Sequence, residues 1–537
     1  MHHDGWTARR LAPAFLGLLL VVSAACAGTS APAPITGAQP ASGAAAPQPK
    51  RGGTLIFGTE KDLSNSNPFV NTSSVPQSIK EMVYESLLAY DIEGRGQPSL
   101  AERYEVSPDA RVFTFSLRKG VKFHNGQEMT ADDVIWSAGY ASEPTNGAQG
   151  TASLNLIRQV DKVDDYTVRF TLAEPGVAFL AHMSEIRALP IVPAKSLEPG
   201  TLRTGNNPPP GTGPFRFVEW RPDDQVTMER NDDYWDGAPF LDRIVFKLIP
   251  DPSVRFTALR AGDIQAAERI PIDWAERIDR GEVRGIKMYP ARISDFRRVV
   301  FNFESKMVQD VRLREAVILS IDRDAYIQEV LLSYGQPTEV NAPPDSVWSK
   351  SVNLPPRKRD LVRSRQLLTE AGYNGEQINL IGRRGHEEIM ESIVPRMQEA
   401  GLNLKVEILE SRVYDERQAK GAFDITLRGG NTDNEPSVGI MPDFYSEFGP
   451  ERGRNYAGYK NPEVDRLFDQ LGTEVNQDRR ISIFRDVMRK IYDDAVEYDL
   501  AFGWRFFATR DNVRDFLPTD NGGYQSRSAG LKKTWID

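Results

Sequence analysis

The alternation of apolar and polar side chains predicts several strands in the first third of the chain. In Val112 to Leu117 every second residue is phenylalanine or leucine, which is the period of a strand with one buried face. Val163 to Leu172 alternates in the same way, and Gly53 to Gly58 alternates weakly. Ser78 to Tyr90 instead carries apolar residues at helical spacing and predicts an amphipathic helix. Thr130 is placed to cap a second helix.

A compact succession of strand, helix and strand follows near the middle of the chain. Ile244 to Ile249 is apolar except for Lys247 and predicts a strand that ends at the following prolines. Ser253 is placed to cap a helix, and Gly262 stands where a helix commonly ends in a left-handed residue. Asp263 to Ala266 resumes as a strand, so the unit predicts two parallel strands with a right-handed crossover. The packed face of its helix is predicted to hold Val254, Thr257, Ala258 and Ala261.

Helices and strands alternate again after residue 360. The pattern predicts helices at Leu361 to Gly372, Glu388 to Gly401 and Arg479 to Asp493, and strands at Ile378 to Ile381 and Leu404 to Leu409. This alternation is typical of an α/β lobe with a partly parallel sheet.

The segment between these two regions predicts a connection. Val299 to Phe303 reads as a strand, and Asp310 and Asp322 are placed to cap the next two helices. Near the other end of the chain, Leu500 to Phe507 is a late apolar strand.

Several sequence motifs are not explained by secondary structure alone, and together they resemble those of a known family. The chain resembles the peptide and nickel class, family 5, of bacterial extracellular solute-binding proteins, the receptors that hand ligands to ABC transporters. The matching residues are Asn231-Asp232-Asp233-Tyr234-Trp235, Gly237, Pro239, Leu241-Asp242 and Leu259-x-Ala261-Gly262-Asp263, with further matching text at 100–138, 296–331 and 455–470.

This resemblance implies an α/β fold with two lobes. It is the periplasmic-binding-protein-like fold, type II and similar to cluster C, with an extra subdomain in lobe I. The family crosses between its lobes near this point of the chain, so we expect the hinge at Phe296 to Val300. The expected division is a signal peptide (1–25), a lipidated cysteine and flexible tether (26–50), lobe I (51–90, 205–296 and 500–537), its extra subdomain (91–204) and lobe II (297–499).

The first 25 residues predict export. Arg9 and Arg10 precede an apolar stretch from Leu11 to Ala25, which is too short to span a membrane and has the form of a secretory signal.

Cys26 is the only cysteine, so we expect no internal disulfide. The text from Ser23 to Cys26 resembles a lipoprotein cleavage box, in which the thiol receives a lipid. The alternative is an ordinary cleavage site at Ala24 or Ala25. Ala27 to Lys50 consists almost entirely of Ala, Pro, Gly, Ser and Thr, and predicts an extended tether between a lipid surface and the folded body.

Composition and motifs argue against several functions. The net charge is -9 and no basic cluster is present, so nucleic acid is not an expected partner. Nucleophile-elbow, zinc-protease and phosphate-loop motifs are absent from the sequence, and His124, His182 and His386 lack the spacing of metal ligands. We therefore expect no enzyme, no cofactor and no metal.

The resemblance implies a role in transport. We expect a monomeric substrate-binding component of an ABC importer, held by a lipid in the periplasm or on the outer face of the cytoplasmic membrane. It would capture a peptide or peptide-like solute between its lobes and deliver it to the permease subunits. The alternatives are the same receptor fold binding an oligosaccharide, a nickel complex or another polar solute, or a ligand sensor. A cell-surface hydrolase is the least favoured reading.

The resemblance also implies binding residues. Asp433 matches the aspartate that holds the ligand's ammonium group in peptide-binding relatives, and Asn431 stands beside it. The alternative for Asp433 is a turn before Pro436. Arg383 and Arg384 follow a predicted strand where some relatives bind the ligand's carboxylate, although loop arginines are often only solvated. Trp504 is a candidate wall of the cleft or a core residue.

The sequence departs from the family pattern at two places. The family's Gly-Trp is Gly429-Gly430 here, and an Asp-x-Pro pattern before the late strand is replaced by the text from Asp494 to Asp499. These departures indicate a divergent member and leave nickel complexes, oligosaccharides and other polar solutes open beside a peptide.

Overall fold

The computed structural model describes residues 48–537 except 64, 71–73, 92–95, 149, 151–153, 197–207, 432–434, 450–454 and 519–529. The chain divides after Gln48, and the elements below belong to the compact unit Pro49–Asp537. The predicted signal segment, Cys26 and most of the tether lie outside the described residues. Within the described ranges, no helix is both long and apolar enough to cross a membrane.

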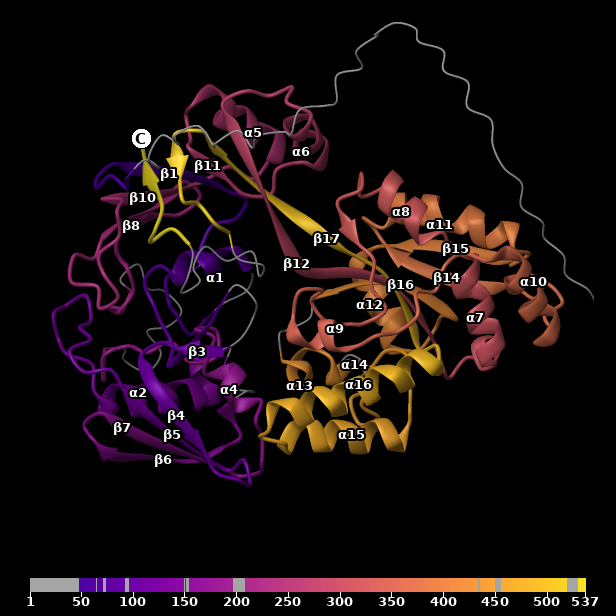
Figure 1. Ribbon diagram of the computed structural model, residues 1–537, viewed down its shortest axis with the longest axis horizontal. Coiled ribbons are helices and arrows are strands. Elements are labelled where there is room, and N and C mark those ends of the chain that lie inside the picture. The colour runs from indigo at the N-terminus through magenta and orange to yellow at the C-terminus, as the bar shows by residue number, and fades with distance from the viewer. Residues whose placement is uncertain are drawn as a thin grey trace, which may run out of the picture. The chain divides into compact units, whose positions relative to one another are not determined.

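One mixed sheet runs through the second unit and contains strands of both lobes (Figure 1). Its strand order is β15-β14-β16-β12-β17-β11-β1-β10-β9-β8, and β13 pairs with β17. The long antiparallel strands β12 (Ile286–Phe301) and β17 (Glu497–Arg510) pass from one lobe to the other. This arrangement confirms the predicted two-lobed α/β fold, while the expected domain limits stay a prediction. The other strands of the sheet are β1 (Thr54–Thr59), β8 (Phe215–Arg221), β9 (Gln225–Arg230), β10 (Arg243–Leu248), β11 (Ala266–Ala267), β13 (Gly335–Gln336), β14 (Ile378–Arg383), β15 (Leu404–Leu409) and β16 (Ile425–Asn431).

A separate four-stranded antiparallel sheet forms the extra subdomain, in the order β4-β5-β7-β6. The alternation predicted for β5 (Val112–Leu117) is confirmed. The single strand predicted from Val163 is wrong, because the chain turns at Asp165-Tyr166 and forms a hairpin. Thr130 caps α2 (Ala131–Ser142) as predicted. The hairpin is β6 (Ile157–Asp164) and β7 (Thr167–Leu172), and β4 (Ala101–Val106) lies at the far edge.

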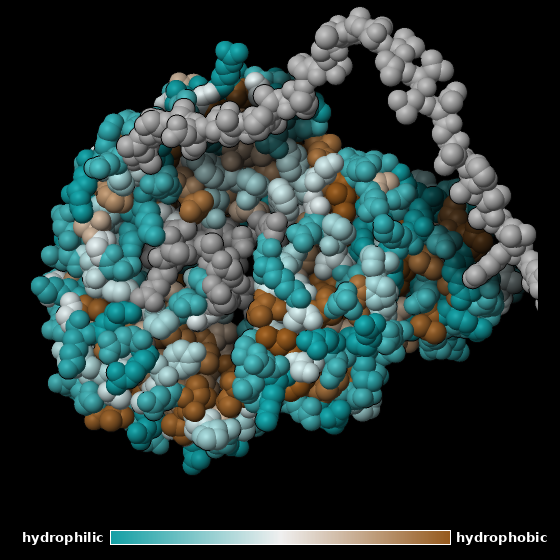
Figure 2. Space-filling model, viewed as in Figure 1, coloured by the Kyte–Doolittle hydropathy of each residue, from teal (hydrophilic) through white to brown (hydrophobic). Residues whose placement is uncertain are grey.

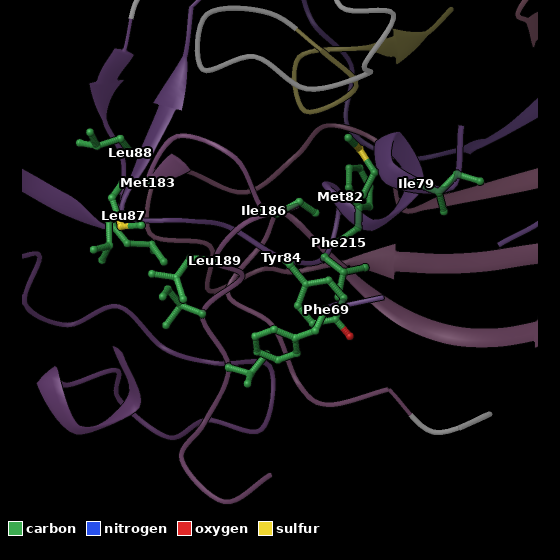
Figure 3. Close-up of a cluster of buried hydrophobic side chains, with 14 of the residues drawn as sticks. Phe69, Ile79, Met82, Tyr84, Leu87, Leu88, Met183, Ile186, Leu189 and Phe215 are labelled. Atoms are coloured by element: carbon green, nitrogen blue, oxygen red, sulfur yellow. The ribbon is translucent and has the colours of Figure 1, made fainter. Parts of the chain in front are cut away.

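The helix predicted from Ser78 to Tyr90 is wrong for most of its length. α1 covers Ser74–Lys80, and the chain is extended again at β2 (Leu88–Tyr90). The carbonyl oxygens of Met82 and Val83 accept from backbone N–H groups of a distant segment, Gly213 and Phe215. The apolar residues of this text are buried in a core that surrounds the chain, so tertiary contacts override the helical spacing (Figure 3).

The predicted central unit is present with three corrections. α5 (Pro252–Ala261) ends at Gly262 in the left-handed region, φ 92°, as predicted. Its cap is Asp251 and not Ser253, because the carboxylate accepts two backbone N–H groups and Pro252 needs no acceptor. Its packed face holds Phe256 and Leu259, whereas Val254 is exposed. The flanking strands β10 and β11 are both parallel to β1, which lies between them.

Lobe II follows the predicted alternation closely. β14 is parallel to both β15 and β16, which confirms a partly parallel sheet. Asp310 and Asp322 cap their helices as predicted. Its helices are α7 (Val311–Ser320), α8 (Arg323–Glu329), α9 (Val347–Ser351), α10 (Leu361–Glu370), α11 (Glu387–Glu399), α12 (Ser411–Ala419), α13 (Pro436–Gly439), α14 (Met441–Phe444), α15 (Pro462–Thr473) and α16 (Gln477–Asp493). The remaining elements are β3 (Gly96–Pro98), η1 (Pro144–Asn146), α4 (Phe179–His182), α6 (Ile272–Asp279), η3 (Lys306–Val308), β18 (Val513–Arg514) and β19 (Trp535–Ile536).

The Tyr234-Trp235 pair of the family motif contacts one buried carboxylate in lobe I. Glu85 accepts hydrogen bonds from the Tyr234 hydroxyl at 2.8 Å, the Trp235 indole N–H at 3.0 Å and the Thr212 hydroxyl at 2.8 Å. Burial nevertheless raises the pKa of Glu85. The tyrosine and tryptophan pair of the motif is therefore explained by a polar contact between three distant stretches of the chain.

Candidate functional site

Two predicted residues lie on the two strands that flank β12. Asn431, at the end of β16, lies opposite Asp295 of β12, and Trp504 of β17 lies opposite Arg292. The pairing of β12 with β17 shifts register on both sides of Phe296, so the irregular part of the ladder overlaps the predicted hinge. The hinge itself stays a prediction.

Trp504 is half-buried and packs against aromatic rings. Its ring centroid is 6.0 Å from that of Tyr334, which in turn meets Phe506 edge-on at 4.9 Å. The Tyr334 hydroxyl donates to Asp279 of α6, so residues from both sides of the crossing strands meet here. These ring contacts explain why the Trp504 side chain is partly buried. Its role as a cleft wall stays a prediction.

The structure places Arg383 and Arg384 at the carboxyl end of β14. Both side chains are exposed, and the Arg384 guanidinium pairs with Glu410 at 2.5 Å. Since β14 is the neighbour of β16 and runs parallel to it, the two arginines and Asn431 share one edge of the sheet. An exposed ion pair stabilises little, so the Glu410 contact leaves Arg384 able to exchange partners.

Asp433 lies outside the described residues, but the structure describes both ends of the segment that carries it. The segment leaves β16 at Asn431, and Glu435 then caps α13. Glu435 also pairs with Arg480 at 2.5 Å in a buried contact. The role of Asp433 in ligand binding stays a prediction.

Sequence reasoning missed a buried charge cluster on β12. The Arg298 guanidinium donates to Asp443 of α14 at 2.8 Å and to Glu497 of β17 at 2.7 Å. All three side chains are at most 6% exposed. Burial works against the charge of Arg298, but the two carboxylates outweigh it and raise the pKa of the guanidinium. An arginine inside the apolar text FRRVVF was the available signal, since a buried charge requires a partner.

The segment that departs from the family, Asp494 to Asp499, runs into β17 and supplies two buried acids. Burial raises the pKa of Glu497, and burial together with the neighbouring Glu497 raises the pKa of Asp499 well above its ordinary value. Asp499 Oδ1 and Asn341 Oδ1 are buried without a hydrogen-bond partner among the described residues. Both residues line a cavity of about 20 Å³ with Glu339, Arg357 and Glu497. The cavity has room for about one water molecule and lies inside lobe II.

The other departure, Gly429-Gly430, lies beside the Arg297 and Phe296 side chains of β12. A Cβ at Gly429 would lie 2.7 Å from Arg297 Nη1, and a Cβ at Gly430 would lie 3.5 Å from the Phe296 ring. Beside them, the Arg428 guanidinium lies 4.1 Å from the Tyr456 ring centroid. The end of β16 therefore lies among arginine side chains and aromatic rings.

The described residues contain no candidate metal site. No group of three or more His, Cys, Asp and Glu side chains in those ranges could hold a metal ion. His124 lies against the Gly213 carbonyl at 2.9 Å, and burial lowers its pKa to about 4.

Comparison with known proteins identifies the family. The model described as bacterial extracellular solute-binding proteins, family 5 Middle, matches residues 96–451. The chain is 26% identical to the oligopeptide-binding protein AppA of Bacillus subtilis, over 95% of this chain and 96% of AppA.

Solved structures share the fold. HbpA2 from Haemophilus parasuis superposes with a TM-score of 0.81 at 22% identity, over 90% of this chain and 100% of that one. The periplasmic binding protein DppA from Helicobacter pylori, solved with the peptide STSA, gives 0.71 at 24% identity, over 91% and 98%. The family match spans more than half of the chain and includes the Tyr234-Trp235 motif and the crossing strand β12. The chain therefore belongs to family 5 of the bacterial extracellular solute-binding proteins.

Proposed function

We propose that this protein is the substrate-binding component of an ABC importer. It captures a peptide or peptide-like solute in a cleft between lobe I and lobe II and delivers it to the membrane permease. Cys26 carries a lipid that anchors the exported monomer, and residues 27–50 form its tether. The mechanism is capture without conversion, because a ligand that contacts both lobes favours the closed state over the open one.

One observation carries this proposal: two lobes are joined through the adjacent strands β12 and β17, and Asn431 and Trp504 lie on the two strands that flank β12 there. Such a two-stranded connection suits a hinge motion. The peptide ligand is supported by the relatives, since AppA is named as oligopeptide-binding and DppA was solved with a peptide.

A thermal-shift screen, confirmed by calorimetry, tests the ligand class. Di- to pentapeptides, oligosaccharides and nickel chelates are offered to the purified protein, and a ligand that binds the native state raises Tm by mass action. Selective shifts by free-amine peptides that disappear on acetylation of the amine support the proposal. Shifts by sugars or nickel chelates alone would replace the ligand class and keep the receptor.

Asp433→Ala tests the amine contact. We expect peptide binding to weaken by about 1 kcal/mol or more, because a ligand ammonium would lose its charged partner. Asp415→Ala, which changes an exposed acid on α12, serves as the matched control. Unchanged affinity in the calorimeter would remove Asp433 from the site.

Cys26→Ser tests the anchor. Without the thiol no lipid is attached, so the variant is expected in the soluble fraction after cell lysis and ultracentrifugation. A variant that still sediments with lipid contradicts lipidation at this residue.

A further inference from the structure

A loop of the subdomain contacts lobe II at a point separate from the crossing strands. The backbone N–H of Val177 donates to the Gly472 carbonyl at 2.9 Å. Val177 lies in the loop between β7 and α4, and Gly472 belongs to the last turn of α15. Figure 1 shows α4 of the subdomain on the side of lobe II where α15 lies. Val177 is 5% exposed, so its side chain is covered although it stands in a loop.

The loop presents Val177 from a fixed support. On one side, Gly176 N–H donates to the Ala110 carbonyl at 3.0 Å. On the other side, the fully buried Phe179 ring packs on Phe113 at 5.0 Å and on Phe170 at 5.3 Å. The donor therefore belongs to the rigid sheet of the subdomain and moves with it.

The acceptor is a helix end that needs a donor. The last four carbonyls of a helix have no partner inside the helix. In α15, the Gln470 carbonyl accepts from Glu474 N–H, and the Leu471 carbonyl accepts from the Arg480 guanidinium at 3.3 Å, both within lobe II. The Gly472 carbonyl receives Val177 N–H from the subdomain. The partial negative charge of the helix end favours this donor.

From this geometry we infer that the Val177 loop is a latch, which holds the subdomain against the end of α15 when the two lobes are closed. This inference deepens the proposed function, because ligand entry and release would then require the latch to open. The contact gives the extra subdomain a role in closing the cleft, in addition to its role as part of lobe I.

A pair of engineered cysteines tests the contact without any ligand. Cys26 is the only native cysteine, so the full chain carrying Cys26→Ser has no competing thiol. Val177→Cys with Gly472→Cys is treated with a short bifunctional thiol reagent. A Cβ at Gly472 meets no heavy atom within 4 Å, so the site accepts the substitution. The matched control combines Gly472→Cys with Val163→Cys, an exposed position on β6 of the same subdomain.

We expect the Val177 pair to cross-link at least tenfold more efficiently than the Val163 pair. Equal yields for the two pairs would overturn the latch. Circular dichroism of both double variants checks that they fold alike, so a low yield from misfolding is recognised.

The gating role is tested with the di- to pentapeptide pool. We expect the uncross-linked double variant to show the thermal shift of the wild-type protein and the cross-linked variant to show none, because the closed latch blocks entry. An equal shift before and after cross-linking would overturn the gating role. If the wild-type protein itself shows no shift, the peptide proposal fails, whereas the ligand-free cross-linking result still decides whether the latch contact exists.

Discussion

Lobe I and lobe II each contain buried ionisable side chains, but the two lobes stabilise these side chains differently. In lobe I, the single carboxylate of Glu85 accepts from three neutral donors. In lobe II, the Arg298 guanidinium is held between two carboxylates, and Asp499 lies nearby. If Glu85 is replaced, its neutral donors leave no buried charge behind. If one partner of the Arg298 ion pairs is replaced, the other partner remains as a buried charge without compensation.

This difference predicts different sensitivities. The Glu85 contacts connect distant stretches of one lobe, and losing one hydrogen bond leaves the others in place. The Arg298 cluster joins both crossing strands to α14, so its loss leaves buried carboxylates uncompensated beside the predicted hinge. Figure 2 shows a mainly hydrophilic face with hydrophobic residues in separate patches. The Glu85 and Arg298 networks are buried beneath such a surface.

The largest effect is expected for Arg298→Met. The substitution keeps the length of the side chain but leaves Asp443 and Glu497 buried without their partner, which should cost about 3–5 kcal/mol of unfolding free energy. Urea unfolding measures it. Arg312→Met is the control, because Arg312 and Asp310 form an exposed pair that should contribute at most about 1 kcal/mol. A similar small loss for both variants would contradict the importance of the buried cluster.

A smaller effect is expected for Glu85→Gln. The amide keeps the shape of the side chain and one acceptor oxygen for the Trp235 indole N–H and the Thr212 hydroxyl, and the Tyr234 hydroxyl can reorient to accept from the new NH2 group. We expect a loss of about 0.5–1.5 kcal/mol by the same urea assay, because hydrogen bonds to a carboxylate become hydrogen bonds to a neutral amide. Glu102→Gln, at an exposed position, should change nothing measurable. A loss as large as that of Arg298→Met would show that the two networks are equally sensitive.

The smallest effect is expected for Asp499→Asn at low pH, and it grows as pH rises. Because the folded protein raises the pKa of Asp499, the favourable contribution of its protonated form is complete at low pH and is lost as pH rises through the folded value. The asparagine variant should therefore gain on the wild-type protein as pH rises, by about 1.4 kcal/mol for each unit of pKa increase. Urea unfolding from pH 4 to 8 measures the difference, with the exposed Asp486→Asn as control. A constant difference across this range would show that Asp499 titrates normally.

The local sequence was sufficient to predict an element where the hydrogen-bond partners that define it lie within a few residues. Asp310 and Asp322 cap their helices through N–H groups two and three residues away, and β15 has the predicted limits. Ser78 to Tyr90 failed because the partners of its backbone come from Gly213 and Phe215, which no local pattern reveals.

The candidate site was predictable only in part, for the same reason. Asn431 and Trp504 were named from resemblance, but their positions opposite Asp295 and Arg292 of β12 depend on strand register, which is set by tertiary pairing. The partners of Arg298 lie 145 and 199 positions away in the sequence, so its pairing could not be inferred from neighbours.

The route of the chain through the sheet has a consequence for the order of folding during synthesis. β11 and β12 both pair with β17, so the strands of lobe I wait for residues 497–510 before their sheet is complete. The Lys532 ammonium, which contacts the Asp236 carboxylate, arrives later still. The helices and parallel strands of lobe II are contiguous and can associate as soon as they emerge. The lobe that begins the protein is thus finished last, and its early segments must remain free of aggregation until the final strand is available.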